Sequence, residues 1–223
     1  MDRDVKRDYH STLRTAQAAE TRRAVVAAAL RLFVTHGYGA TTIDAVAKAA
    51  GVSRKTVFTS VGGKVELLKT ALDWTVAGDD RQVAVGDRPR MRDVLALDDP
   101  ERLLTEWAHV MVEIDQRVTG VFRALEVAAE TDDDAHRLLE EAQQQRLDGA
   151  REVVKRLAKL DALNSETSRS EAVDVAWLST DPVLFDRFVR VRGWSVTRFE
   201  AWLSRMLIGQ LLRSNHSREA TPR

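Results

Sequence analysis

The chain has 223 residues, of which 44% are apolar and 30% charged, so it can bury a sizeable core and is not a disordered polymer. It contains no cysteine, which excludes disulfides and thiolate metal sites. No apolar run approaches the ~20 residues that span a bilayer. The first residues do not form a secretory signal, so we expect a cytoplasmic protein with no membrane partner.

The charge is divided unequally along the chain, although the net charge is zero. Residues 1–64 contain 11 lysine and arginine residues against 5 acidic ones, whereas the remainder contains 23 against 29. Two interpretations are open: a basic module carried on an acidic body, or chance clustering. A motif within the basic segment would favour the first.

The helical period of the apolar residues dominates the chain, and no segment alternates as a strand would. We therefore predict an all-α fold of about nine or ten helices. Residues 1–20 are expected to form a flexible N-terminal arm. The first helix should begin near Thr21 and end at Gly37 and Gly39, because glycine tolerates the positive φ that closes a helix.

Three shorter helices are predicted to complete an N-terminal domain over residues 21–76. Thr42 is placed to cap the first of them and Ser53 the second. Gly51 lies between these two helices, where a tight turn needs positive φ. The third helix begins after Gly62-Gly63.

A connector, a larger helical region over residues 100–212 and a polar tail at 213–223 are predicted to follow. Residues 77–99 contain glycine and proline and are expected to form a connector with about one helical turn. The larger region should open with a helix from Pro100 to about Val118 and a second helix over Val121–Ala129. Its later helices are expected from Thr131 to about Lys159, after a Ser168 capping box, from Pro182 and around Phe199–Leu207.

The segment Thr42–Val61 has the spacing of a helix-turn-helix, in which two short helices cross through a turn of about 3–4 residues. Ala47 is small where the helices approach, and the space between them is filled by Val46, Val52 and Val57. The second helix would then expose a basic pair and several hydroxyl groups. An ordinary helical hairpin is the alternative, but it rarely carries that pattern on its second helix.

The same region resembles the TetR family of bacterial one-component regulators. The residues that carry the resemblance are Leu32-Phe33, Gly37-Tyr38-Gly39-Ala40, Thr41-Thr42-Ile43, Val46-Ala47, Ala50-Gly51-Val52-Ser53, Thr56-Val57-Phe58, Gly63-Lys64 and Leu67-Leu68. Val191 to Leu212 also resembles the final helices of many members, whereas Ser60-Val61 replaces the family's usual His/Tyr-Phe ending. The resemblance implies a homodimer that places two recognition helices on a palindromic DNA operator.

The predicted DNA contacts are of three kinds. Basic side chains can reach guanine or phosphate, and hydroxyl groups can donate to phosphate or base edges. The basic residues are Lys48, Arg54, Lys55 and Lys64, and the hydroxyl residues are Thr42, Ser53, Thr56, Thr59 and Ser60. Lys48 and the arginines before residue 24 are expected to add unspecific attraction, and Lys64 lies at a helix start, which favours phosphate. Phe58 either contacts a thymine methyl group or packs between the helices.

Residues 100–212 have the size of the family's effector-binding and dimerisation region. Four apolar or aromatic residues at helical spacing line either a ligand pocket or plain core: Trp107, Met111, Phe122 and Trp177. Asp115 and Arg146 interrupt apolar stripes, where a polar group is costly to bury without a partner. Each of these two either meets a small-molecule effector or lies on a solvated edge or in an internal ion pair.

The C-terminal helices, Pro182–Val191 and Val196–Leu212, are candidates for the dimer interface. Their apolar residues Phe185, Phe188, Trp202 and Met206 offer a large apolar surface, and Gly209 would let two helices approach closely. The alternative is that these residues form intramolecular core.

No catalytic, metal or cofactor site is predicted. The five histidines, His10, His36, His109, His136 and His216, lack metal-binding spacing. Asp132-Asp133-Asp134 could hold a cation but is more simply explained as a cap at a helix start. We therefore predict a ligand-gated repressor, with an all-helical interaction protein that binds no specific DNA as the alternative.

Overall fold

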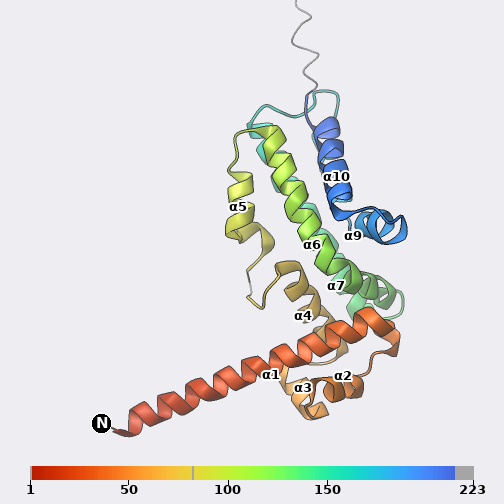
Figure 1. The fold of residues 1–223 in the computed structure, drawn as a ribbon. Coiled ribbons are helices and arrows are strands. Elements are labelled where there is room, and N and C mark those ends of the chain that lie inside the picture. The colour runs from red at the N-terminus through yellow and green to blue at the C-terminus, as the bar shows by residue number, and fades with distance from the viewer. Residues whose placement is uncertain (1, 82, 214–223) are drawn as a thin grey trace, which may run out of the picture. The chain divides into compact units, whose positions relative to one another are not determined.

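The computed structural model describes residues 2–81 and 83–213, with side chains from Arg14 onward (Figure 1). Most of the predicted polar tail, residues 214–223, lies outside the described residues. Within the described ranges the chain forms ten α-helices and no strand, apart from one isolated bridge between Leu163 and Leu212. The all-α prediction is therefore confirmed.

The chain divides into two compact units. The first comprises Met1–Thr75 with Gly120–Leu139, and the second comprises Val76–Thr119 with Glu140–Arg223. Residues 120–139 thus pack with the N-terminal helices, although their sequence places them in the predicted effector region.

Helix α1 (Asp2–Ala40) begins earlier than predicted. The sequence suggests a flexible arm over residues 1–20, but residues 2–20 are helical. This stretch contains neither glycine nor proline and includes three alanines and three arginines, which favour the helix. Near the predicted end of the helix, Gly37 kinks it with φ 79° and ψ 169°.

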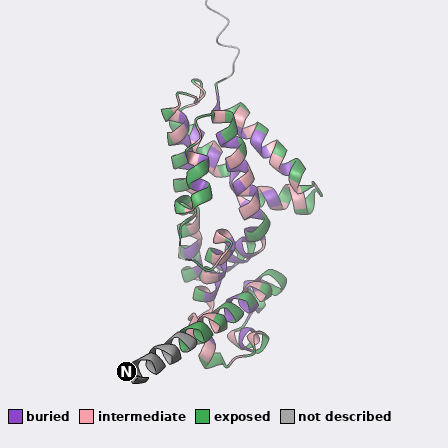
Figure 2. Ribbon diagram, turned by 60° about the vertical axis from the view of Figure 1, so that its left-hand side comes forward, coloured by how far each residue is buried: buried purple, intermediate pink, exposed green. Residues whose placement is uncertain are grey.

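The first unit is completed by α2 (Ile43–Ala50), α3 (Arg54–Ser60), most of α4 (Lys64–Ala77) and the adjoining parts of α6 and α7. Its core takes one side of each helix, which Figure 2 shows as buried stripes beside exposed ones. The fully buried side chains include Val25, Ala28, Ala29, Val46, Val57, Leu67, Leu68 and Ala71. The helical spacing of these residues is that of helices that each pack one side inward.

The segment between α4 and α6 is more ordered than the predicted connector. It contains a 3₁₀ turn at Val85–Asp87 and helix α5 (Pro89–Leu95), which buries Met91 and Val94. Proline at the first position of α5 favours a helix start there, because proline has no N–H to leave unsatisfied.

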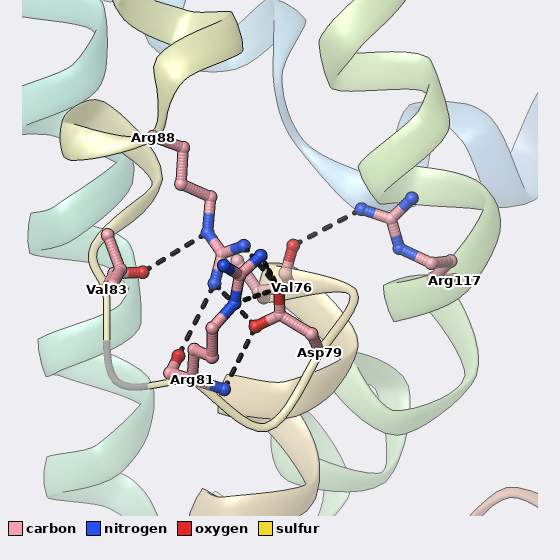
Figure 3. Close-up of polar contacts among 6 residues, drawn as sticks. All are labelled: Val76, Asp79, Arg81, Val83, Arg88 and Arg117. Carbon is pink, nitrogen blue, oxygen red and sulfur yellow. Dashed lines mark hydrogen bonds and ion pairs between the residues drawn. The ribbon is translucent and has the colours of Figure 1, made fainter.

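Asp79 organises the start of this segment, as Figure 3 shows. The two oxygens of its carboxylate each accept a hydrogen bond of 2.9 Å from the guanidinium of Arg88. The backbone N–H and the side chain of Arg81 also donate to it. These donors, Arg88 foremost, hold the pKa of Asp79 well below its usual range. One carboxylate thus closes a loop between residues 79 and 88.

Helix α6 (Pro100–Ala129) is continuous, where the sequence predicts two helices that meet near residue 120. Gly120 lies inside it, and a Cβ at that position would be 3.0 Å from a methyl group of Val34. The glycine therefore serves close packing against α1 and does not end the helix. The predicted start is confirmed, since Asp99 accepts from the backbone N–H of Arg102 at 3.0 Å.

The remaining predicted helices are also confirmed. They are α7 (Asp133–Lys159), α8 (Arg169–Ser179), α9 (Pro182–Phe185) with a π-helical turn at Asp186–Val191, and α10 (Val196–Leu211). Ser168, Asp181 and Ser195 cap α8, α9 and α10 through their side-chain oxygens. No helix in the described part of the chain is long and apolar enough to cross a membrane.

Candidate nucleic-acid interface

The turn between α2 and α3 has the geometry that the sequence predicts. Thr42 caps α2, and its hydroxyl oxygen accepts from the backbone N–H of Ala45 at 3.1 Å. Gly51 closes the helix in the left-handed region, with φ 70° and ψ 28°. The N–H of Val52 then donates to the carbonyl of Ala47 at 3.0 Å, which satisfies a carbonyl at the helix end.

Helix α3 starts at a second cap and is held by one buried residue. The hydroxyl of Ser53 accepts from the backbone N–H of Thr56 at 3.1 Å. Val57 is fully buried, as are Val46 and, nearly, Ala47 on α2. Because a helix that buries Val57 turns its opposite side outward, Arg54, Lys55 and the neighbouring polar residues face solvent.

Phe58 belongs to this exposed face, since its side chain is 46% exposed. The sequence left two interpretations of Phe58 open, contact with a thymine methyl group or packing between the helices. The exposure of its side chain argues against packing between the helices. Arg54 lies over the Phe58 ring at 5.7 Å and forms an ion pair with Asp44 of α2 at 3.2 Å. Asp44 was not singled out by its sequence, because acidic residues are common in the first turn of a helix.

The hydroxyl groups differ in what they can still offer to DNA. The hydroxyl oxygens of Thr42 and Ser53 accept hydrogen bonds from backbone N–H groups, so the O–H of each residue can still donate to another group. The hydroxyl oxygen of Ser53 also lies 2.8 Å from the hydroxyl oxygen of Thr56. By contrast, the hydroxyls of Thr59 and Ser60 donate to carbonyls of their own helix. A phosphate only accepts hydrogen bonds, so these last two hydroxyls must rotate to reach one.

Arg22 makes a specific contact within the protein, whereas the sequence predicts only an unspecific attraction to DNA for it. Its guanidinium donates to the carbonyl of Ser60 at 2.5 Å. That carbonyl lies in the last turn of α3, where no later N–H of the helix is available. Arg22 thus tethers the C-terminal end of α3 to α1.

Lys64 lies at the start of α4, and its side chain lies over the ring of Tyr38. Its ammonium is 4.0 Å from the centre of the Tyr38 ring, and burial lowers its pKa. Burial and the hydrogen bond that the Tyr38 hydroxyl donates to Asp132 at 2.7 Å raise the pKa of Tyr38, and the same hydrogen bond lowers the pKa of Asp132. The carboxylate of Glu66 folds back towards Gly63, so the helix start already has an acidic neighbour.

Lys48 and Lys55 are exposed, and within the described part of the chain neither has an ion-pair partner. The face that α2 and α3 present therefore carries Lys48, Arg54, Lys55 and the hydroxyl of Thr42, with Phe58 between charged groups. Positive side chains and hydroxyl donors of this kind suit the phosphates and base edges of DNA.

Of the predicted effector residues, the second unit brings Asp115, Arg146 and Trp177 together. Arg146 donates to the carbonyl of Trp177 at 3.1 Å, and its guanidinium lies 5.4 Å from the centre of that ring. It also forms an ion pair with Asp181 at 3.0 Å. Asp115, on α6, is 3% exposed. Asp181 was predicted only as a helix cap, a function that it also performs.

The other predicted effector residues are Trp107, Met111 and Phe122. Trp107 is 2% exposed and Met111 packs beside it against the core of the second unit. Phe122 is buried in the first unit. Among the described residues no group of three acidic or histidine side chains is arranged to hold a metal ion, and Asp132 caps α7.

The predicted dimer residues fall into two sets. Phe185 is 5% exposed and packs edge-on against Phe199, within the chain's own core. Phe188, Trp202 and Met206 are half-buried, and nothing lies within 4 Å of a Cβ built at the exposed Gly209.

The comparisons with known proteins concern first the helix-turn-helix. The sequence profile of the bacterial regulatory proteins of the tetR family matches residues 25–71. Two HTH-type transcriptional regulators of Pseudomonas putida, SrpR and TtgW, are each 42% identical over 57 residues, or 26% of this chain. The chain matches only 27% of the length of SrpR and 42% of that of TtgW.

The similarity to solved structures covers most of the chain but concerns the fold alone. NalD, the secondary repressor of the MexAB-OprM multidrug efflux pump in Pseudomonas aeruginosa, superposes with a TM-score of 0.64. The match covers 88% of this chain and 99% of NalD at 20% sequence identity.

Proposed function

Because residues 25–71 match the profile of the tetR family of bacterial regulatory proteins, we propose that the chain is a DNA-binding transcriptional regulator of that family and not an enzyme. The observation that carries the proposal is the outward face of α3. Caps at Thr42 and Ser53 and the buried Val57 fix this helix, while Arg54 and Lys55 are exposed on it. A short capped helix with basic side chains on its first turn suits the major groove.

The regulator acts in the cytoplasm as a homodimer on a palindromic operator. One α3 of seven residues touches few base pairs, so two copies related by a twofold axis are needed for useful specificity. The half-buried Phe188, Trp202 and Met206 near the C-terminus support an apolar interface between copies.

The regulator represses its genes and responds to a small molecule. NalD, which shares the fold, is a repressor, and this supports the direction of control. The buried polar group at Asp115 in the second unit supports ligand binding, because such groups are costly to bury without a partner. By linkage, a molecule that weakens DNA binding must itself bind more weakly to the DNA complex.

The test measures the affinity of the full chain for a duplex selected from random DNA. Arg54→Ala and Lys55→Ala are each expected to weaken this affinity by about 5- to 150-fold, since a good base contact is worth about 1–3 kcal/mol. Lys159→Ala, which removes an exposed charge at the end of α7, is the matched control and should bind as the unaltered chain does.

Circular dichroism of each variant should stay helical, because none of the three side chains is buried. Unchanged affinity in both Arg54→Ala and Lys55→Ala would refute the assignment of α3 as the reading helix. Failure of the full chain to bind any duplex at low salt would instead favour an all-helical interaction protein.

A further inference from the structure

The second unit contains a buried carboxyl group whose hydrogen bonding is incomplete. Asp115 on α6 is 3% exposed, and its Oδ2 atom has no hydrogen-bond partner among the described residues. The nearby hydroxyl of Thr119 does not help, since it donates to the backbone carbonyl of Asp115. A buried polar atom left in this way destabilises a folded chain, so its retention needs an explanation.

Two nitrogen atoms of the same neighbourhood are also unsatisfied. The indole Nε1 of Trp177 on α8 and the Nη1 of Arg146 on α7 are buried, and neither atom has a hydrogen-bond acceptor within the described ranges. Arg146 from α7 connects the two sites, because its guanidinium stacks over the Trp177 ring and acts electrostatically on Asp115. The unsatisfied groups of Asp115 and Trp177 therefore come from separate helices and share one neighbour.

The charges of this cluster do not balance. Arg146 is already committed to Asp181, with an ion pair of 3.0 Å, and donates to the carbonyls of Thr180 and Trp177. Two carboxyl groups thus face one guanidinium, which leaves a net charge of −1 when both are ionised. Burial raises the pKa of Asp115 well above its usual value, Arg146 opposes this rise, and Asp181 adds to it. A cation placed beside Asp115 would balance the charge of this cluster.

The neighbours of Asp115 one turn away on its own helix are apolar. On α6, Met111 and Val118 lie one turn before and after it, and Val118 is 2% exposed. A small inorganic cation would need several oxygen ligands, which these residues do not supply. An organic cation with an apolar body suits both the charge and the environment.

We propose that Asp115, with Arg146 and Trp177 beside it, binds the charged end of an amphiphilic monocation, a protonated amine carried on an apolar body. The inference rests on the proposed function, since this amine would be the effector that the regulator senses. The ammonium donates to the Oδ2 atom of Asp115, and the Trp177 N–H is available to an acceptor on the same molecule. Because the pKa of Asp115 is raised, at a pH where its carboxyl group holds a proton the ammonium takes the place of that proton, which passes to the solvent.

The first experiment uses the full chain without DNA and three probes with the same ten-carbon body, decylamine, decanol and decanoate, below micellar concentration. Isothermal titration calorimetry is expected to show that decylamine binds at least about tenfold more tightly than the other two, a difference of about 1.4 kcal/mol. Asp115→Asn should remove this preference and leave decanol binding unchanged. Asp174→Asn, an exposed aspartate on α8, is the matched control and should keep the preference.

A second measurement does not depend on any variant. Titrations at about pH 5 in buffers of different ionisation enthalpy report protons released on binding. Decylamine should release protons and decanol should not, because only the cation displaces the proton of Asp115. The groups that face Asp115 and act on its titration are Arg146 and Asp181.

The proposal is overturned if decylamine binds no more tightly than decanol, or equally well to Asp115→Asn. A separate titration with the selected duplex distinguishes this failure from failure of the proposed function. If another compound releases the DNA while decylamine does not bind, the proposed ligand-responsive regulator is supported and the proposed amine site is refuted. If decylamine binds as expected but leaves DNA affinity unchanged, the amine site is supported and the proposal that this amine controls DNA binding is refuted.

Discussion

At the scale of single residues, the ion pair between Arg54 and Asp44 controls how the reading helix presents its charge. Both side chains are mostly exposed, at 62% and 69%, so the pair contributes little to stability. Arg54 must nevertheless exchange Asp44 for a base or a phosphate when DNA binds. Asp44 also brings a negative charge to the face that meets DNA.

Asp44→Asn is therefore expected to raise DNA affinity by about 1.4- to fivefold, which corresponds to the about 0.2–1 kcal/mol of an exposed ion pair. The gain should shrink as salt is added, because exposed charges are screened. Fluorescence anisotropy on the selected duplex measures both effects, and Asp174→Asn on α8 serves as the control. An affinity that falls in Asp44→Asn would show that the carboxylate positions Arg54 for its contact.

The sequence predicts the residues of the reading helix better than their partners. Thr42, Gly51 and Ser53 were identified because caps and left-handed turns depend on local chemistry. The contacts of Arg22 with Ser60 and of Tyr38 with Asp132 join residues far apart in the sequence, which helical periodicity cannot detect. Phe58 stayed ambiguous for the same reason, since its exposure depends on what packs beside α3.

At the scale of elements, the segment between α4 and α5 is held by charge more than by apolar packing. Asp79 accepts from Arg88 and Arg81, while Arg117 of α6 donates to the carbonyl of Val76 at 3.3 Å (Figure 3). Because the pKa of Asp79 is lowered, this support is present above the ordinary aspartate value and is lost as the pH falls through the lowered one.

Asp79→Ala should loosen this loop, because Arg88 and the backbone N–H of Arg81 lose their common acceptor. Trypsin is then expected to cleave after Arg81 several times faster than in the unaltered chain. Mass spectrometry of the early fragments gives the rates. Asp87→Ala, an exposed aspartate of the same segment, is the control, and equal rates in the two variants would contradict the role of Asp79.

Helix boundaries are predictable from sequence where a capping residue marks them. They are not predictable where a contact between distant residues determines them. Ser168, Asp181 and Asp99 start helices as their sequence predicts. Gly120 suggests a break, but it lies inside α6 because Val34 packs against it. A glycine is needed at this position of the helix because α1 packs closely against it, and the local sequence does not reveal that contact.

At the scale of the whole molecule, the charge split of the sequence follows the two units only in part, because the acidic run Asp132–Asp134 belongs to the first unit. The first unit contains the helix-turn-helix, and the second contains the buried cluster at Asp115. Helices α6 and α7 each contribute residues to both units, which no pattern in the sequence predicts. A molecule bound at Asp115 would therefore act on a helix that also carries Gly120, packed against α1.

The central claim is that α3 reads DNA as part of a twofold dimer, and selection of bound duplexes from a random library by the full chain tests it most directly. We predict an enriched site with two inverted half-sites whose centres are about 34–36 Å apart, or a related spacing. Lys55→Ala should lose this enrichment while the exposed control Lys159→Ala retains it. A library that emerges without any enriched sequence, or with the same site from Lys55→Ala, would contradict the account.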